Sequence, residues 1–255
     1  MSSPALAGDD RALAGPVTAL RGMPFLDDAF ASGRLLAAVA AVRHVRAERA
    51  GMAGWISDAE AGAWLAPARA FMLRRDPPPI PAIALSAGRR QMINDALRGV
   101  AAVIPAWEPL LRLPVRFALM YPLNGAISAS SHAWPQHVLL ADEAFSTARE
   151  LSEQVVHELC HQWLYLIEEV WPLEVAGAHL FILPSGTPGR TPAEVLGAAH
   201  VAAALARIYQ AAHAGLAGRA VSLACYGREC LGLPGLGEYL TDAGWQVTRR
   251  LEEAL

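Results

Sequence analysis

Two histidines that lie one helical turn apart form the strongest chemical signal in the sequence. The stretch His157-Glu158-Leu159-Cys160-His161 falls inside a long predicted helix, where residues four apart share a face. Both imidazoles can therefore bind one metal ion, and Glu158 can act as a general base or orient a ligand. Apolar residues such as Leu151 and Trp163 surround the pair, and unpaired polar groups are costly to bury on such a helix. We therefore expect a metal site at His157 and His161, with Glu158 as the catalytic candidate.

A third metal ligand is expected, because two protein ligands rarely hold a metal ion alone. The extended metzincin pattern would need glycine at 164 and histidine at 167, whereas this chain has Leu164 and Ile167. That class is excluded. The best candidate is His200, because small residues flank it in a predicted helix and would let this helix approach another backbone closely. The alternative for His200 is a core histidine bonded to a backbone carbonyl. Glu174 and His179 remain weaker candidates.

The order of several segments points to a known type of enzyme. The segments are Gly125 to Ser130, Pro135 with 137–140, the HExxH helix, an irregular loop that ends at Arg190, then His200, and finally Leu240 to Gly244. In this order they resemble the α-ketoglutarate-dependent HExxH-type peptide β-hydroxylases, a family associated with peptide natural-product clusters. The resemblance covers about residues 115–250, and the N-terminal part is similar to the family only in its helical character.

The resemblance implies a non-haem Fe(II) enzyme that uses 2-oxoglutarate and O2. Its reaction would hydroxylate a side-chain β-carbon in a ribosomally made precursor peptide. The resemblance also implies that His157, His161 and His200 hold the iron and that Glu158 sits beside it, where it orients a ligand.

The resemblance further implies a cation for the distal carboxylate of 2-oxoglutarate. Arg190 is the candidate, because a planar guanidinium can contact both carboxylate oxygens. Arg207 is the alternative, since it lies seven residues after His200 on the same helical face. The chain departs from the family at Thr191, which separates Arg190 from the following proline.

A zincin-type metallopeptidase is the main alternative function. In that case Zn2+ lowers the pKa of a bound water and Glu158 accepts its proton. Both functions need His157 and His161, but a peptidase has no general need of Arg190 or Arg207 near the metal. A metal-free peptide-binding module is a third possibility, which retention of metal after purification would argue against.

Hydrophobic spacing and turn residues predict an α+β, mainly helical protein. Helices are expected at 30–45, 59–73, 92–104, 146–170 and 191–212 and from about 241, and strands at 115–121, 125–131 and 137–140. Thr191, Pro192 and Glu194 together are typical of a helix N-terminus. We expect the strands to form a small sheet that flanks a zincin-like HExxH helix. The proline-rich segment 74–81 cannot be helical inside and is the best candidate for a linker or an extended crossover. We expect a helical N-terminal part, 1–110, and the HExxH catalytic region, 111–255, unless both form one continuous domain.

The composition of the chain limits the classes of partner that it is expected to bind. The 255 residues are 54% hydrophobic and 18% charged, which allows a sizeable core and excludes a disordered chain. The apolar runs are shorter than the roughly 20 residues of a spanning helix, so no membrane partner is expected. A formal net charge of −3 without a basic block argues against nucleic-acid binding. All 21 basic residues are arginine, which excludes Schiff-base and Walker-lysine mechanisms. Three cysteines and the lack of a secretory signal predict a reduced, cytoplasmic protein.

Overall fold

The computed structural model describes residues 14–52, 61–121, 125–212 and 216–255. Within these ranges the chain is 61% helical, with ten α-helices and a small four-stranded mixed sheet. The helices are α1 (Pro16–Leu20), α2 (Ser32–Arg49), α3 (Ala61–Trp64), α4 (Pro67–Met72), α5 (Ala87–Val103), α6 (Glu108–Leu111), α7 (Ala148–Val170), α8 (Pro192–Ala212), α9 (Ala217–Leu231) and α10 (Asp242–Ala254). The strands are β1 (Ala82–Ile83), β2 (Arg116–Met120), β3 (Ser128–Ala129) and β4 (His137–Leu140). The predicted mainly helical α+β class is therefore confirmed.

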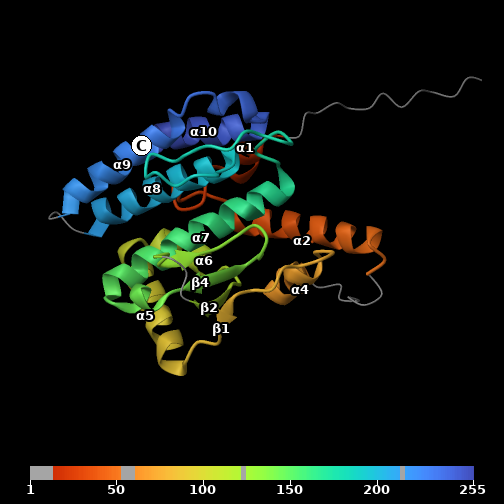
Figure 1. The fold of residues 1–255 in the computed structure, drawn as a ribbon, viewed down its shortest axis with the longest axis horizontal. Coiled ribbons are helices and arrows are strands. Elements are labelled where there is room, and N and C mark those ends of the chain that lie inside the picture. The colour runs from red at the N-terminus through yellow and green to blue at the C-terminus, as the bar shows by residue number, and fades with distance from the viewer. Residues whose placement is uncertain (1–13, 53–60, 122–124, 213–215) are drawn as a thin grey trace, which may run out of the picture.

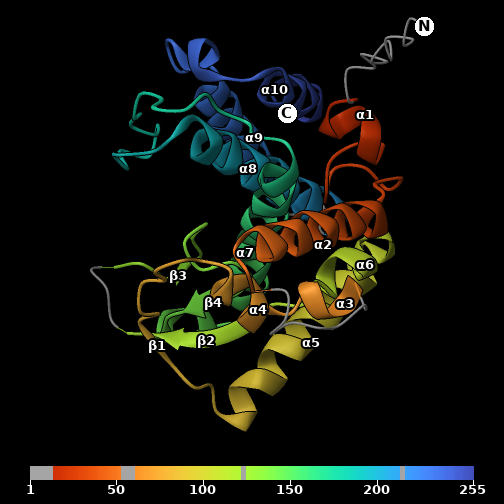
Figure 2. The ribbon, with the colours of Figure 1, turned by 90° about the vertical axis from the view of Figure 1, so that its right-hand side faces the viewer.

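Helix α7 crosses the middle of the molecule (Figures 1 and 2). The sheet and α5 lie on one side of it, and α8, α9 and α10 lie on the other. It packs against α2, α5 and α8 and also contacts β3 and β4. Side chains of α7 can therefore meet residues from segments that are far apart in the sequence.

The sheet has the strand order β1-β2-β4-β3. Strands β2 and β4 are parallel, with Phe117 opposite Val138. Strand β3 pairs antiparallel with β4, with Ser128 opposite Leu140, and so forms one edge of the sheet. All four residues of β4 are buried, so β3 is the strand that carries side chains from the sheet edge toward α7.

Side-chain caps fix where the two central helices begin. At α7, Thr147 accepts a hydrogen bond from the backbone N–H of Glu150 at 3.0 Å. At α8, the N–H of Glu194 donates to Thr191 Oγ1, and the N–H of Thr191 donates to Glu194 Oε2 at 2.9 Å. This reciprocal pair is a capping box, as the sequence predicts for residues 191–194. It holds the start of α8 beside the end of the preceding loop.

One hydrophobic core joins the two parts of the chain that the sequence separates near residue 110. It contains Leu20, Phe25 and Leu35 from the N-terminal part and Val247 and Leu251 from α10, all fully buried. The core therefore runs through both regions without a break.

Several predicted elements differ in detail. The strand predicted at 137–140 matches β4, whereas the one at 125–131 is reduced to the two residues of β3. The helix predicted at 59–73 is divided into α3 and α4, because Pro67 cannot donate a backbone hydrogen bond and starts a new helix; residues 59 and 60 lie outside the described residues. Helix α9 and strand β1 were not predicted.

By length and composition, α8 meets the criteria of a membrane span. However, 67% of its most apolar stretch is buried inside the protein. A core helix passes the same test, so this is weak evidence for a membrane span.

Candidate functional site

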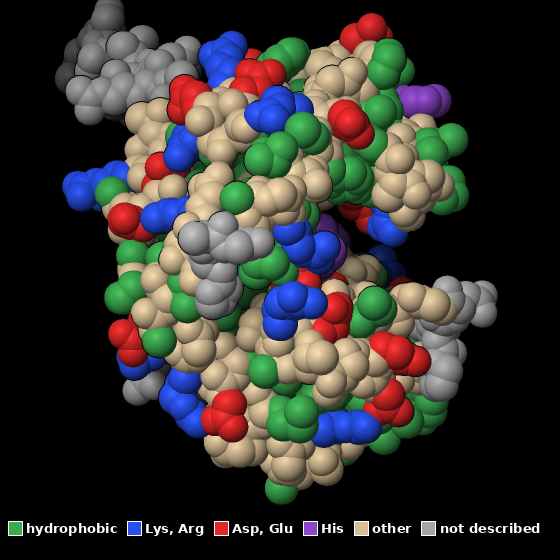
Figure 3. All heavy atoms as spheres, turned by 90° about the vertical axis from the view of Figure 1, so that its left-hand side faces the viewer, with side chains coloured by type: hydrophobic (Ala, Val, Ile, Leu, Met, Phe, Trp, Pro, Cys, Tyr) green, Lys and Arg blue, Asp and Glu red, His purple; other side chains and the backbone are tan. Residues whose placement is uncertain are grey.

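The two histidines of α7 face a cavity of about 560 Å³. The Nε2 atoms of His157 and His161 are 3.2 Å apart, and both side chains line the cavity. Residues of the β3 segment, α8, α9 and loop 183–190 form the other walls. Figure 3 shows a hollow in the surface with a histidine side chain inside it, between basic and acidic side chains. The structure thus brings the two predicted ligands together.

The separation of the two nitrogens suits a shared metal ion. Nitrogen ligands at roughly 2.1 Å from an ion, with an angle of about 90–110° between them, lie roughly 3.0–3.4 Å apart. The observed 3.2 Å between His157 and His161 falls in this range. The distance between the two nitrogens is therefore compatible with one shared ion.

The surroundings of His161 keep its ring uncharged. Burial lowers the pKa of His161 well below its ordinary value, and positive charge on His157, His200 or Arg190 lowers it further. A neutral imidazole is the form that binds metal. The Nδ1 side of the ring packs on α8, where a Cβ at Gly197 would lie only 3.0 Å from Nδ1. Gly197 therefore allows α8 to approach His161 this closely.

Glu158 is buried beside the histidine pair. Its Oε1 lies 3.9 Å from His157 Nε2 and 2.6 Å from the hydroxyl of Ser128 on β3. The same hydroxyl lies 2.7 Å from Gln154 Oε1, and its single hydrogen can donate to only one of these two oxygens. Glu158 Oε2 has no hydrogen-bond partner among the described residues. This oxygen is therefore available to accept a proton or a hydrogen bond.

Arg190 lines the same cavity as the histidine pair. Backbone hydrogen bonds with Phe181 hold it in place just before α8. One guanidinium nitrogen, Nη1, donates to Glu194 Oε1 at 3.2 Å. The Nε atom is buried and has no partner in the described part of the chain. Arg190 therefore places a guanidinium group with one carboxylate contact at the wall of the cavity.

Arg207, the alternative cation, lies elsewhere. It donates to the backbone oxygen of Phe25 at 3.1 Å and to Asp28 Oδ1 at 2.6 Å. Its guanidinium also lies over the ring of Trp107. These contacts direct the side chain toward the N-terminal segment, and it is not among the residues that line the cavity. The structure therefore does not bring Arg207 to the histidine pair.

His200, the predicted third ligand, is also held apart from the cavity. It is fully buried, and its Nε2 lies 2.8 Å from the backbone oxygen of Pro24. Burial lowers the pKa of His200 to about 4, against the opposing effect of the Pro24 and Cys160 carbonyls. The neutral ring thus donates from Nε2 to Pro24, which is the core-histidine arrangement. It does not line the cavity that holds the pair.

The weaker ligand candidates are placed differently again. Glu174 accepts a hydrogen bond from the N–H of Ala193 at 2.8 Å and lines a neighbouring cavity of about 200 Å³. His179 packs against Phe181 and Tyr239. Within the described ranges, no three His, Cys, Asp or Glu side chains are grouped as ligands of one metal ion.

Glu168 belongs to the same neighbouring cavity, which also contains His161. Burial, the largest cause, and the negative charges of Glu174 and Glu194 together raise the pKa of Glu168 to about 7. Near neutral pH this carboxyl group is therefore only partly ionised.

Sequence reasoning missed two residues of the site. Tyr165 stacks on the ring of His161, with ring centroids 6.1 Å apart, and lines both cavities. It lies four residues after His161, so helical spacing alone could have placed it on this face. Ser128 reaches Glu158 from the sheet edge, and no local pattern links two residues that are 30 positions apart.

No protein-family model matches the chain, and no curated protein matches it either.

Proposed function

We propose that this chain is an Fe(II)- and 2-oxoglutarate-dependent dioxygenase that hydroxylates a side-chain β-carbon in a ribosomally made precursor peptide. The observation that carries the proposal is the cavity shared by His157, His161 and Arg190. The two imidazole nitrogens can hold a metal ion, and the guanidinium group can bind the carboxylate of an oxo acid that binds at this metal. The resemblance of the sequence to the HExxH-type peptide hydroxylases supports the same choice.

His157 and His161 would hold the metal ion, in a zincin-like arrangement of α7 against β3 and β4. When bound, Fe(II) with 2-oxoglutarate and O2 would supply the hydrogen abstraction and hydroxyl transfer. Iron oxygenases usually add one carboxylate to two histidines. Glu158 and Glu194 are carboxylates that line the cavity, and they are the residues to test as a third ligand in place of His200, which does not line it.

Arg190 would bind the distal carboxylate of 2-oxoglutarate. Its guanidinium lines the cavity and contacts one carboxylate, that of Glu194, through Nη1 at 3.2 Å, so the other side of the planar group can contact the carboxylate of a ligand. Glu194, its present partner, also accepts from the N–H of Thr191. Arg190 can therefore turn to a ligand without leaving Glu194 unpaired.

The peptide would lie along the edge strand β3. Ile127 accepts a hydrogen bond from Ala141 on the β4 side at 2.8 Å. By the alternation of antiparallel pairs, Ser128 and Ser130 direct their backbone groups away from β4. Both residues line the cavity, so an extended peptide that pairs with them would pass the histidine pair.

A zinc peptidase is the second candidate, and one observation favours it. Glu158 Oε2 is buried and has no partner among the described residues. A carboxylate oxygen in this position, next to a metal-bound water, could take the proton of that water.

Spectroscopy without oxygen tests the proposal and needs no knowledge of the peptide. The protein is loaded with Fe(II), and 2-oxoglutarate is titrated in while the visible metal-to-ligand charge-transfer band is followed. The band should be absent in His157→Ala, and Arg190→Gln should need roughly tenfold more 2-oxoglutarate or more. Arg207→Gln is the matched control, because it makes the same change of charge outside the cavity. Its titration should match the wild type.

Two outcomes would contradict the hydroxylase. One is Fe(II) binding without any band, and the other is an equal effect of Arg190→Gln and Arg207→Gln. If Zn2+ binds tightly without a band and peptide cleavage is lost in Glu158→Gln, the peptidase is the correct function. Partial hydroxylase activity in Glu158→Gln would exclude the peptidase.

A further inference from the structure

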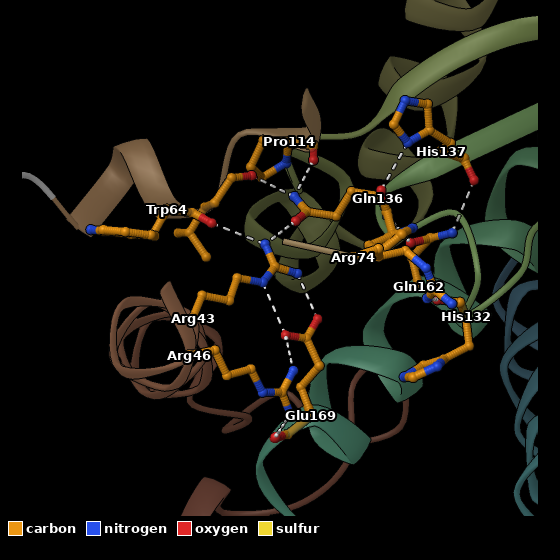
Figure 4. A network of polar contacts seen from close by, with 12 residues as sticks. Arg43, Arg46, Trp64, Arg74, Pro114, His132, Gln136, His137, Gln162 and Glu169 are labelled. Atoms are coloured by element: carbon orange, nitrogen blue, oxygen red, sulfur yellow. Dashed lines mark hydrogen bonds and ion pairs between the residues drawn. The ribbon is translucent and has the colours of Figure 1, made fainter. Parts of the chain in front are cut away.

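A second polar pocket lies on another side of α7, between α2, α4 and the segment that precedes β4 (Figure 4). Its volume is about 80 Å³, enough for a few water molecules or one small ion. The polar side chains that line it are Arg43, Arg46, Arg74, His132, Gln136, Gln162, Tyr165 and Glu169. Neither predicted metal ligand of α7 lines this pocket, so it is separate from the proposed metal site.

The rear wall of this pocket is built from a buried ion pair. Figure 4 shows Arg43 reaching from α2 toward Glu169 and Gln136. Arg43 is 1% exposed and donates to both carboxylate oxygens of Glu169, at 2.9 and 2.6 Å. It also donates to Trp64 O and Gln136 Oε1. Since all these donors have partners, Arg43 is held in place and contributes a fixed positive charge to the pocket, without binding a ligand itself.

Arg74 and Arg46 at the mouth of the pocket have unused donor capacity. Arg74 donates from Nη1 to the backbone oxygen of His132, while its Nε is buried without a partner in the described residues. No ion pair joins Arg74 to an acidic group in the described part of the chain. Arg46 donates from Nη2 to the backbone oxygen of Glu169 at 3.3 Å, and its Nη1 is 3.6 Å from Glu169 Oε2, beyond a good hydrogen bond.

The net charge of the pocket is positive. Three arginines face one carboxylate, that of Glu169, and Arg43 already neutralises this carboxylate from both of its oxygens. Burial lowers the pKa of His132, an effect that the nearby carboxylates of Glu169 and Glu174 oppose and the nearby arginines reinforce, so its ring is neutral and can donate one N–H. The three guanidinium groups therefore carry more positive charge than the one carboxylate of the pocket balances.

We propose that this pocket binds one small oxyanion, either the carboxylate of an acidic peptide side chain or a free phosphate. The guanidinium groups of Arg74 and Arg46 would hold it, because neither makes the two-oxygen carboxylate contact that occupies Arg43. Arginine suits the role, since its planar fork contacts two oxygens of one anion. The alternative occupant is water, which would pair with Arg74 Nε without any preference for anions. This proposal does not depend on the proposed function.

Titration of inorganic phosphate into the full chain tests the proposal. Calorimetry at constant ionic strength should show binding to a single site. Arg74→Gln should weaken the affinity roughly tenfold or more, because a charge-assisted contact is lost. Arg75→Gln is the matched control, since Arg75 is exposed and does not line the pocket. Its affinity should equal that of the wild type.

A second variant and a second probe complete the test. Arg46→Gln removes the other donor from an exposed side chain, so it tests the site even if Arg74→Gln folds poorly. A short peptide with one glutamate, compared with its glutamine counterpart, separates the two sources of the anion. Displacement of phosphate by the glutamate peptide alone assigns the site to a side-chain carboxylate, and phosphate binding without displacement assigns it to a free oxyanion. Absence of phosphate and peptide binding, or equal weakening in Arg75→Gln, would show that the pocket holds water only.

Discussion

Replacing Gly197 with alanine should weaken the proposed binding of metal by His157 and His161 while the fold stays intact. The added Cβ would lie 3.0 Å from Nδ1 and 3.2 Å from Cε1 of His161, closer than the roughly 3.5–4.0 Å of an ordinary contact. The imidazole must therefore retreat by about half an ångström. Because Nε2 of the same ring lies 3.2 Å from His157 Nε2, this retreat changes the separation of the two metal ligands.

Two opposing effects set the size of the change in stability. Alanine favours a helix over glycine by about 0.5–1 kcal/mol, whereas overpacking costs roughly 1–3 kcal/mol. The net loss of unfolding free energy in Gly197→Ala should therefore lie between about 0 and 2.5 kcal/mol. Metal affinity should fall roughly 10–100-fold, the usual effect of disturbing a group that orients a ligand.

Calorimetric titration with Zn2+ measures the affinity, and denaturant unfolding of the metal-free protein measures the stability. Gly99→Ala in α5 is the control, because nothing lies within 4 Å of the Cβ that it would add. That variant should gain about 0.5–1 kcal/mol of stability and bind Zn2+ as the wild type does. If Gly197→Ala also binds Zn2+ with unchanged affinity, the packing of α8 on His161 does not position the ligand.

Two further predictions concern charge. Glu168→Gln should raise the unfolding free energy by roughly 1–3 kcal/mol above pH 7, because the folded carboxyl has a pKa of about 7 instead of 4.5 and so opposes folding as pH rises between these values. In denaturant unfolding at several pH values the gain should vanish below pH 4.5, and a gain independent of pH would contradict the reasoning. Arg43→Met should cost about 3–5 kcal/mol, because it leaves the buried Glu169 carboxylate without its main partner. Arg46→Met, at a side chain that is 55% exposed, should cost no more than about 1 kcal/mol in the same assay.

The parts of the fold that the sequence predicts well depend on local interactions. The span of α7 follows from an apolar helical pattern between the Thr147 cap and Pro172, and the start of α8 follows from the Thr191 capping box. Helix α9 has few buried positions, among them Ala220 and Gly227, and such small residues give no clear apolar stripe. Strand β1 exists only because it pairs with β2, more than 30 residues later.

The same difference between local and long-range interactions decides which residues of the site could be predicted. The proximity of His157 and His161 follows from helical spacing, which is why the pattern alone predicts it. The choice between Arg190 and Arg207 depends on which elements pack against each one. The contacts of Arg207 and His200 with the segment 24–28 join residues more than 170 positions apart. No spacing rule predicts such contacts, so both residues were reasonable candidates that the fold places elsewhere.

The pairing of Arg190 with Glu194 leads to a last prediction. A co-substrate carboxylate at Arg190 must compete with Glu194 Oε1, which now accepts from Nη1 at 3.2 Å. Glu194→Gln removes this competing charge, while glutamine can still complete the capping box with Thr191. The variant should therefore bind 2-oxoglutarate several-fold more tightly in the anaerobic Fe(II) titration, with α8 unchanged by circular dichroism. Weaker binding with an intact helix would mean that Glu194 itself contacts the metal or the oxo acid, and its role would then be that of a ligand instead of a competitor.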